Sequence, residues 1–222
     1  MELPSKLTAT QLKGRELDRE MAEDTAQGMR SRPEESVGQT LRRPRFAEEE
    51  FGLTSAQKGV ALHLVMQYID FDKTASAAQV AREIRRLVRE EFLTPEQGDA
   101  VEPERIAAFF ASPLGREVRA ARGLRREFKF SLLVPARDYW PEAGEEERVL
   151  LQGVVDCCFE MSEGITVVDF KTDRVRGEAL RRRAEGYRSQ LETYSRALEE
   201  IMDRPVVRRV LWFFSEDRAV EL

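Results

Sequence analysis

Hydrophobic positions repeat with a helical period in the first half of the chain. They predict helices over residues 5–22, 54–70, 77–91, 104–110 and 114–121. Residues 24–46 are rich in polar residues, Gly and Pro and have no apolar period, so they are expected to form a mobile connection.

The second half of the chain has a different pattern. Runs of β-branched and aromatic residues bounded by turn residues predict strands over 125–135, 148–161, 164–172 and 206–215. One long helix is expected between the last two strands, over 177–203, because Pro205 stops it. This order predicts an α/β or α+β sandwich, and the apolar strands require helices on both faces of the sheet.

Length and composition narrow the class of protein. A chain of 222 residues suits one full domain, which we place at 47–222, after a helical lead-in at 1–23 and the flexible connection at 24–46. Charged residues make up 35%, and no apolar run reaches the ~20 residues that span a bilayer. The start of the chain lacks the apolar core of a secretory signal, so a cytoplasmic location is expected. A net charge of −5 argues against nucleic-acid binding by the whole surface and leaves room for a local basic groove.

Two acids and a lysine stand within the predicted strands. Asp169 and Lys171 are two residues apart, so they project from the same face. A two-residue turn at Glu163 and Gly164 would set Asp156 opposite Lys171 on that face, whereas a three-residue loop without a compensating bulge would turn Asp156 to the other face.

Crowded carboxylates repel each other unless a cation lies between them. Mg²⁺ or Mn²⁺ would satisfy the acids and activate a water, and Lys171 would stabilise charge on a phosphate. Alternatively, the acids pair with arginines or lie at exposed strand ends. A D-x-K pattern in a strand is by itself weak evidence of catalysis.

Two predicted helices add polar side chains at a spacing of four residues. His63 and Gln67 form one such pair, and Gln190 and Tyr194 form the other. A lone histidine is more often structural than a ligand, and Tyr194 fits core packing as well as a site.

Five sequence elements, taken in order, carry a resemblance to a known family. "GVALH", "GVVD", "VVDFKTD" and "QLETY", together with the opening "SKLTATQLKGR", resemble the RecB-family PD-(D/E)xK nucleases over essentially the whole chain. Within them, the chain looks most like the AddA-type domain at the C-terminal end of bacterial helicase–nucleases. The resemblance implies a restriction-endonuclease-like core, a mixed β-sheet flanked by helices, with extra N-terminal helices.

The resemblance also implies roles for individual residues. The implied metal ligands are His63, Asp156, Asp169 and the Phe170 carbonyl, with Mg²⁺ or Mn²⁺ as the cofactor. Catalysis would fall to Asp156, Asp169 and Lys171, and Gln190 and Tyr194 would position the active site or the DNA backbone. Glu127 lies where such domains often carry an acid, although an ion pair at the strand edge explains it equally well.

The implied substrate is single-stranded DNA, delivered by a helicase region of the same parent polypeptide with an AddB-like second subunit, in double-strand-break repair and recombination. No four-cysteine iron–sulfur arrangement is present, which favours the AddA type, and no ATP-binding P-loop motif occurs. Arginines just beyond Lys171 are expected to hold DNA phosphates: Arg174, Arg176, Arg181, Arg182 and Arg183. Solvated ion-paired faces are the alternative for such clusters.

Two rival hypotheses remain at this point. One is a catalytically inactive nuclease fold that serves as a DNA-binding or subunit-docking module. The other is a structural interaction domain whose acids are paired with arginines.

Overall fold

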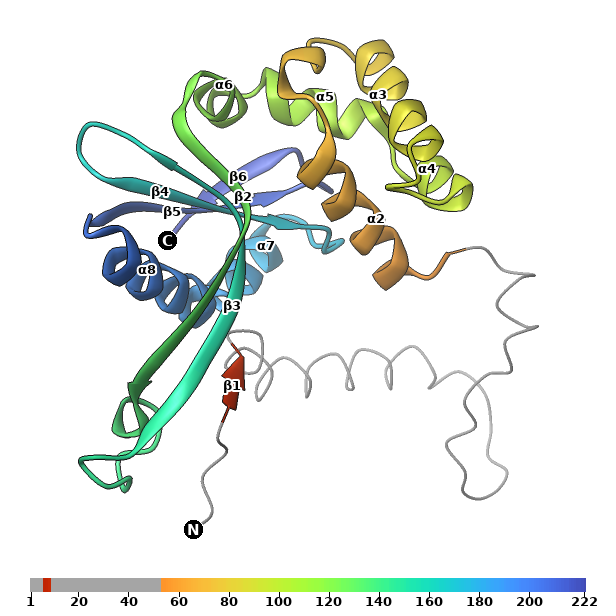
Figure 1. Ribbon diagram of the computed structural model, residues 1–222. Coiled ribbons are helices and arrows are strands. Elements are labelled where there is room, and N and C mark those ends of the chain that lie inside the picture. The colour runs from red at the N-terminus through yellow and green to blue at the C-terminus, as the bar shows by residue number, and fades with distance from the viewer. Residues whose placement is uncertain (1–5, 9–52) are drawn as a thin grey trace, which may run out of the picture. The chain divides into compact units, whose positions relative to one another are not determined.

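The structure, a computed structural model, describes residues 6–8 and 53–222 (Figure 1). The predicted connection at 24–46 lies outside the described residues, as does most of the predicted lead-in. The described part of the lead-in is strand β1, Lys6–Thr8, so the helix predicted there is wrong for these three residues. Strand β1 pairs in parallel with residues 150–152, and Leu7 is buried. Residues 6–8 form a strand because pairing with this distant segment satisfies their backbone hydrogen bonds.

The chain divides into two compact units. The sheet unit comprises residues 1–15 and 108–222, and the helical unit comprises residues 16–107. No helix in the described part of the chain is both long enough and apolar enough to span a lipid bilayer.

The helical unit contains the first helices that the sequence predicts. These are α2 (Ser55–Tyr68), α3 (Ala77–Arg89) and the start of α5 (Pro103–Ala111), and the sequence analysis missed the short helix α4 (Pro95–Ala100). Thr54 begins α2 with a capping box: its side chain accepts from the Gln57 N–H while the Gln57 side chain accepts from the Thr54 N–H. Helix α4 begins at Pro95, a few residues after the end of α3. Proline suits the first turn of a helix because the backbone N–H that it lacks would be unpaired there in any case.

The sheet unit is built on a mixed six-stranded sheet, which confirms the predicted fold class. Strands β2 (Arg122–Pro135), β3 (Arg148–Glu160) and β4 (Ile165–Lys171) form an antiparallel meander. Strand β5 (Val206–Phe213) then pairs in parallel with β4, and β6 (Arg218–Glu221), which the sequence analysis missed, pairs with β5.

Two helices, not one, connect β4 to β5. They are α7 (Glu178–Glu185) and α8 (Arg188–Met202), so the single helix predicted over 177–203 is wrong. The chain turns at Gly186 and Tyr187, where glycine weakens a continuous helix. The break lets both helices bury an apolar face against the same sheet.

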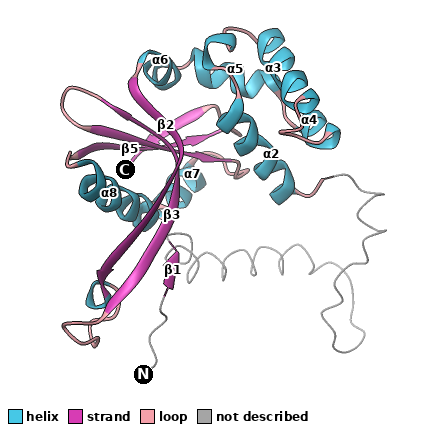
Figure 2. Ribbon diagram, in the orientation of Figure 1, coloured by secondary structure: helices cyan, strands magenta, loops and turns pink. Residues whose placement is uncertain are grey.

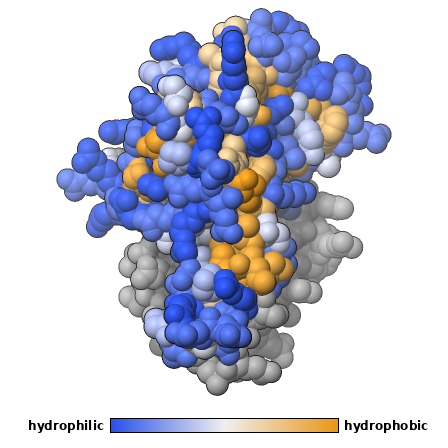
Figure 3. Space-filling view, turned by 60° about the vertical axis from the view of Figure 1, so that its left-hand side comes forward, coloured by the Kyte–Doolittle hydropathy of each residue, from blue (hydrophilic) through white to orange (hydrophobic). Residues whose placement is uncertain are grey.

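Helices cover both faces of the sheet, as the apolar strands predict (Figure 2). On one face, Leu191 and Leu198 of α8 pack with Val167 and Leu211 of the strands. On the other, Phe109 at the end of α5 packs edge-on against Phe170 and Trp212. Helix α6 (Pro113–Ala120) lies on this second side, where Glu117 pairs with Arg208 of β5. The face drawn in Figure 3 is mainly hydrophilic, in keeping with the high content of charged residues.

Candidate active site

The turn between β3 and β4 sets which residues meet. The Met161 N–H donates to the Gly164 carbonyl at 2.7 Å, so Ser162 and Glu163 occupy the turn. The ladder therefore runs from Glu160↔Ile165 to Cys157↔Val168. Continued by one pair, it places Asp156 across from Asp169, so the expectation that Asp156 faces Lys171 is wrong. Moving the turn by one residue shifts the pairing by two, which preserves the face on which Asp156 lies.

Beyond that ladder, the Asp156 side chain accepts a hydrogen bond from the backbone of β4. The Phe170 N–H donates to the Asp156 carboxylate at 2.8 Å. A carboxylate that accepts a backbone N–H is fixed in orientation, so Asp156 is tied to the end of β4. The Phe170 ring lies among aromatic side chains on the opposite face. Ligation of a metal by its carbonyl stays a prediction.

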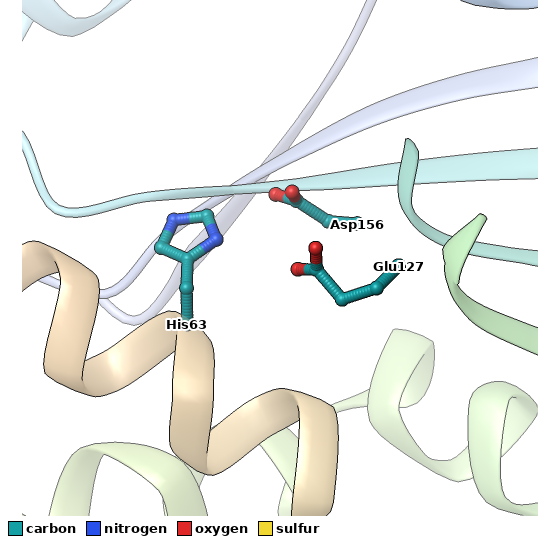
Figure 4. A group of neighbouring side chains, drawn as sticks. All are labelled: His63, Glu127 and Asp156. Atoms are coloured by element: carbon teal, nitrogen blue, oxygen red, sulfur yellow. The ribbon is translucent and has the colours of Figure 1, made fainter. Parts of the chain in front are cut away.

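A third acid joins Asp156 through the pairing of β2 with β3. Arg126 pairs with Cys157 and Phe128 with Val155, so Glu127 lies across from Asp156. Carboxylate oxygens of the two acids lie within 4.8 Å of each other, and Figure 4 shows the two groups side by side. The backbone of Glu127 has φ of 48°, a left-handed conformation that is unfavourable for a residue with a Cβ. Such strain within a strand is typical of functional sites.

The donor set of Glu127 and Asp156 suits a divalent metal. Two ionised carboxylates at this separation repel each other, and a cation between them removes the repulsion. Their oxygens are hard ligands of the kind that Mg²⁺ and Mn²⁺ prefer. Figure 4 also draws His63, whose side chain projects from α2 of the helical unit; its role as a metal ligand stays a prediction.

Lys171 is buried with three groups around its ammonium. The residue is 8% exposed, and Nζ forms an ion pair with the carboxylate of Asp169, which is 2% exposed. Nζ also donates to Gln190 Oε1 at 3.3 Å and lies 4.0 Å from the centroid of the Tyr187 ring. Burying a charged pair is favourable only when further polar contacts replace the lost water, and these contacts do so.

Gln190 and Tyr194 extend this arrangement along α8. Gln190 Nε2 donates to the Tyr194 hydroxyl at 2.7 Å, while its carbonyl accepts from Lys171. Burial raises the pKa of Tyr194, and the negative charges of Asp169, Asp156 and Glu127 raise it further. Three acids therefore lie within electrostatic range of one hydroxyl, which stays protonated at neutral pH. The structure thus brings together Asp156, Asp169, Lys171, Gln190 and Tyr194, with Glu127 added.

A second network, which the sequence analysis missed, lies beside Lys171. The Tyr187 hydroxyl donates to Asp173 at 2.8 Å, and Arg183 Nε donates to the same carboxylate at 2.7 Å. Burial alone would raise the pKa of Asp173, but the hydrogen bond from Tyr187 and the charge of Arg183 outweigh burial and hold it below its usual value. The only sequence signal is the position of Asp173 two residues beyond Lys171.

The five arginines predicted to bind DNA occupy different environments. Arg174, Arg181 and Arg182 are exposed, and the exposed Arg176 pairs with Glu216 at 3.2 Å. Arg183 is partly buried in its ion pair with Asp173. DNA binding by these side chains stays a prediction.

The chain is similar to known nucleases. Residues 36–221 match the model of the PD-(D/E)XK nuclease superfamily. Among curated relatives, the A subunit of the ATP-dependent helicase/nuclease from Desulforamulus reducens is 37% identical over 99% of this chain and 17% of its own length. The proteins of the same name from Thermoanaerobacter sp. (strain X514) and Bacillus cytotoxicus are 34% and 37% identical over 99% and 81% of this chain, respectively.

The chain spans only 15–17% of the length of these relatives. A solved structure described as "Crystal structure of SSO0001" is similar at a TM-score of 0.34 and 14% identity, over 79% of this chain and 78% of the other.

Proposed function

Because the chain belongs to the PD-(D/E)XK nuclease superfamily, we propose that it hydrolyses phosphodiester bonds of single-stranded DNA with a divalent metal, Mg²⁺ or Mn²⁺. The observation that carries this proposal is the buried Lys171 ammonium, which contacts both Asp169 and Gln190. In the same sheet, the carboxylates of Glu127 and Asp156 lie close together. A structural domain has no physical reason to bury these charges in its sheet.

Each residue of the site has a role in this proposal. Asp156 and Asp169 bind the metal, with Glu127 as a neighbouring acid; His63 and the Phe170 carbonyl join them on the strength of the family resemblance. The bound ion would polarise a phosphoryl oxygen and lower the pKa of the attacking water. Lys171 stabilises the negative charge that develops on the phosphate as water attacks and the P–O bond breaks. Gln190 holds the Lys171 ammonium in place, and Tyr194 orients Gln190.

The exposed arginines after β4 are candidates for contacts with the DNA backbone. Arg174, Arg181 and Arg182 present positive charge just beyond β4, the strand that ends at Lys171. We assign them and Arg176 to contacts with phosphates. Arg183 acts within the protein through Asp173 and contributes to DNA binding only at longer range.

The names of the relatives support a wider setting. We propose that this chain is the nuclease domain of an AddA-type helicase–nuclease that works with an AddB-like second subunit in the cytoplasm. Repair and recombination at double-strand breaks are part of the same proposal. The inactive docking module is the second candidate, and the experiment below separates the two.

The experiment measures cleavage of a labelled single-stranded oligonucleotide by the purified 222-residue chain with Mg²⁺, Mn²⁺ or EDTA. Cleavage is expected with either metal and none with EDTA. Asp156→Asn and Glu127→Gln should each lower the rate, the former by at least about 100-fold, because charge stabilisation worth several kcal/mol is lost. Asp138→Asn is the matched control and should keep the rate. It removes a carboxylate in the loop after β2 that forms an ion pair with Arg196 of α8.

Calorimetric titration with Mn²⁺ provides a second measurement, in which Asp156→Asn should abolish binding and Asp138→Asn should not. A folded protein that binds DNA but leaves it intact with both metals would support the docking module instead. Cleavage that persists in EDTA would contradict the metal.

A further inference from the structure

Tyr187 holds a position that the proposed chemistry does not yet use. It lies in the break between α7 and α8, is 2% exposed, and presents its ring to the Lys171 ammonium at 4.0 Å from the ring centroid. This is within the distance at which a cation is attracted to an aromatic face. Because Lys171 is buried, water competes little with the contact.

The ring is fixed from three separate segments. Its hydroxyl donates to Asp173, in the segment after β4, and Arg183 of α7 donates to the other oxygen of that carboxylate. The Arg183 guanidinium lies 5.4 Å from the ring centroid. The Ser215 hydroxyl, just after β5, donates to the Asp173 carbonyl and holds that segment to the sheet. Tyr187 therefore has little freedom to rotate away from Lys171.

A lysine has a long flexible side chain, and its ammonium accepts many geometries. Asp169 and Gln190 supply two polar contacts, and the aromatic face of Tyr187 supplies a third contact. We propose that Tyr187 is a positioning residue for the reaction: its ring, clamped by Asp173 and Arg183, holds the Lys171 ammonium at the place where negative charge develops. This inference rests on the proposed function.

The first test compares two substitutions in the DNA-cleavage assay. Tyr187→Leu keeps an apolar side chain but removes the aromatic face, so kcat should fall about 3- to 30-fold while KM stays within about twofold. Tyr187→Phe keeps the ring but loses the hydroxyl that donates to Asp173, so its kcat should lie between those of the wild type and Tyr187→Leu. Tyr139→Leu, a matched aromatic substitution at a partly buried ring in the loop after β2, is the control and should leave kcat unchanged.

A second test does not depend on activity. The chain has only six lysines, so ¹³C labelling of lysine gives a simple NMR spectrum, and Lys171→Arg identifies the Lys171 signal by its loss. The ring current of Tyr187 should move the Lys171 ε-methylene protons upfield in the wild type, by a smaller amount in Tyr187→Phe, and not at all in Tyr187→Leu. Should Tyr187→Leu fail to fold, Asp173→Asn serves in its place, because it loosens the clamp without emptying the core, and should reduce both kcat and the upfield shift.

The outcomes separate this inference from the proposed function. A wild type that shows the upfield shift but does not cleave DNA contradicts the proposed function and leaves the placement of the ring supported. Unchanged kcat in the folded Tyr187→Leu variant, or the absence of the upfield shift in the wild type, overturns the inference. Equal losses in Tyr187→Phe and Tyr187→Leu would also overturn it, since the hydroxyl rather than the ring would then be what matters.

Discussion

The Asp169–Lys171 pair shows how one residue in the sheet constrains another. Both side chains are almost fully removed from water, and each compensates the charge of the other. Gln190 and the Tyr187 ring complete the surroundings of the ammonium. Loss of one partner leaves an uncompensated buried charge, whereas loss of both leaves a neutral core.

Asp169→Asn should therefore destabilise the protein by about 3 to 5 kcal/mol, because Lys171 keeps its buried charge. The double variant Asp169→Asn/Lys171→Met should recover much of this loss, since Met fills a similar volume without a charge. Urea unfolding followed by circular dichroism measures both values, with Asp138→Asn as a control at a more exposed ion pair. If the double variant is less stable than the single variant, the charge argument fails.

The close packing of α6 against the end of α5 depends on one glycine. Gly115 lies in the first turns of α6, and a Cβ there would come 2.0 Å from the Phe109 carbonyl oxygen and 2.6 Å from the Phe110 Cα. Phe109 is the side chain that packs on Phe170 and Trp212. A shift of α6 away from the end of α5 would therefore disturb the packing of Phe109 on the face of the sheet opposite Lys171.

Gly115→Ala is expected to destabilise the protein by about 1 to 3 kcal/mol, because backbone atoms of α5 must shift to admit a methyl group. Gly144→Ala is the matched control: its nearest neighbour is the flexible Glu147 side chain at 3.4 Å, and the change should stay within about 0.5 kcal/mol. Thermal unfolding measures both variants. Equal melting temperatures for the two variants would show that α6 can move away at no cost.

Across the whole molecule, paired carboxylates link stability to pH in both units. Glu83 of the helical unit is buried, which by itself would raise its pKa; hydrogen bonds from Arg86 and from the Asp70 N–H outweigh this and hold the pKa below its ordinary value. In the sheet unit, Tyr187 and Arg183 likewise keep the pKa of Asp173 low. A carboxylate whose pKa is lower in the folded than in the unfolded state stabilises the fold above its unfolded pKa.

That contribution is lost as the pH falls through the folded pKa. The free energy of unfolding should thus be nearly constant from neutral pH down to about 4.5, the ordinary pKa of a glutamate, and fall below it. Glu83→Gln should be less stable than the wild type at neutral pH and should show a shallower fall below about pH 4.5. Urea titrations at a series of pH values test this, and parallel curves for the two proteins would contradict the role of Glu83.

The sequence by itself determined the features that depend on near neighbours in the chain. The alternation along β4 places Asp169 and Lys171 on one face, and the helical period sets Gln190 one turn from Tyr194. The apolar runs likewise predicted strands β2 to β5 and the need for helices on both faces of the sheet. A repeat of two or about 3.6 residues follows from backbone geometry alone, so it can be recognised without knowing what lies across from it.

Only the tertiary structure decided what meets between strands and helices. The turn at Ser162 and Glu163 set the register that brings Asp156 to the end of β4, where its carboxylate accepts from the Phe170 N–H, and the pairing of β2 with β3 brought in Glu127. The break before Tyr187 then carried its ring to Lys171, where one continuous helix had been expected. These contacts join residues far apart in the chain and are selected by the packing of the whole sheet, so no local pattern in the sequence specifies them.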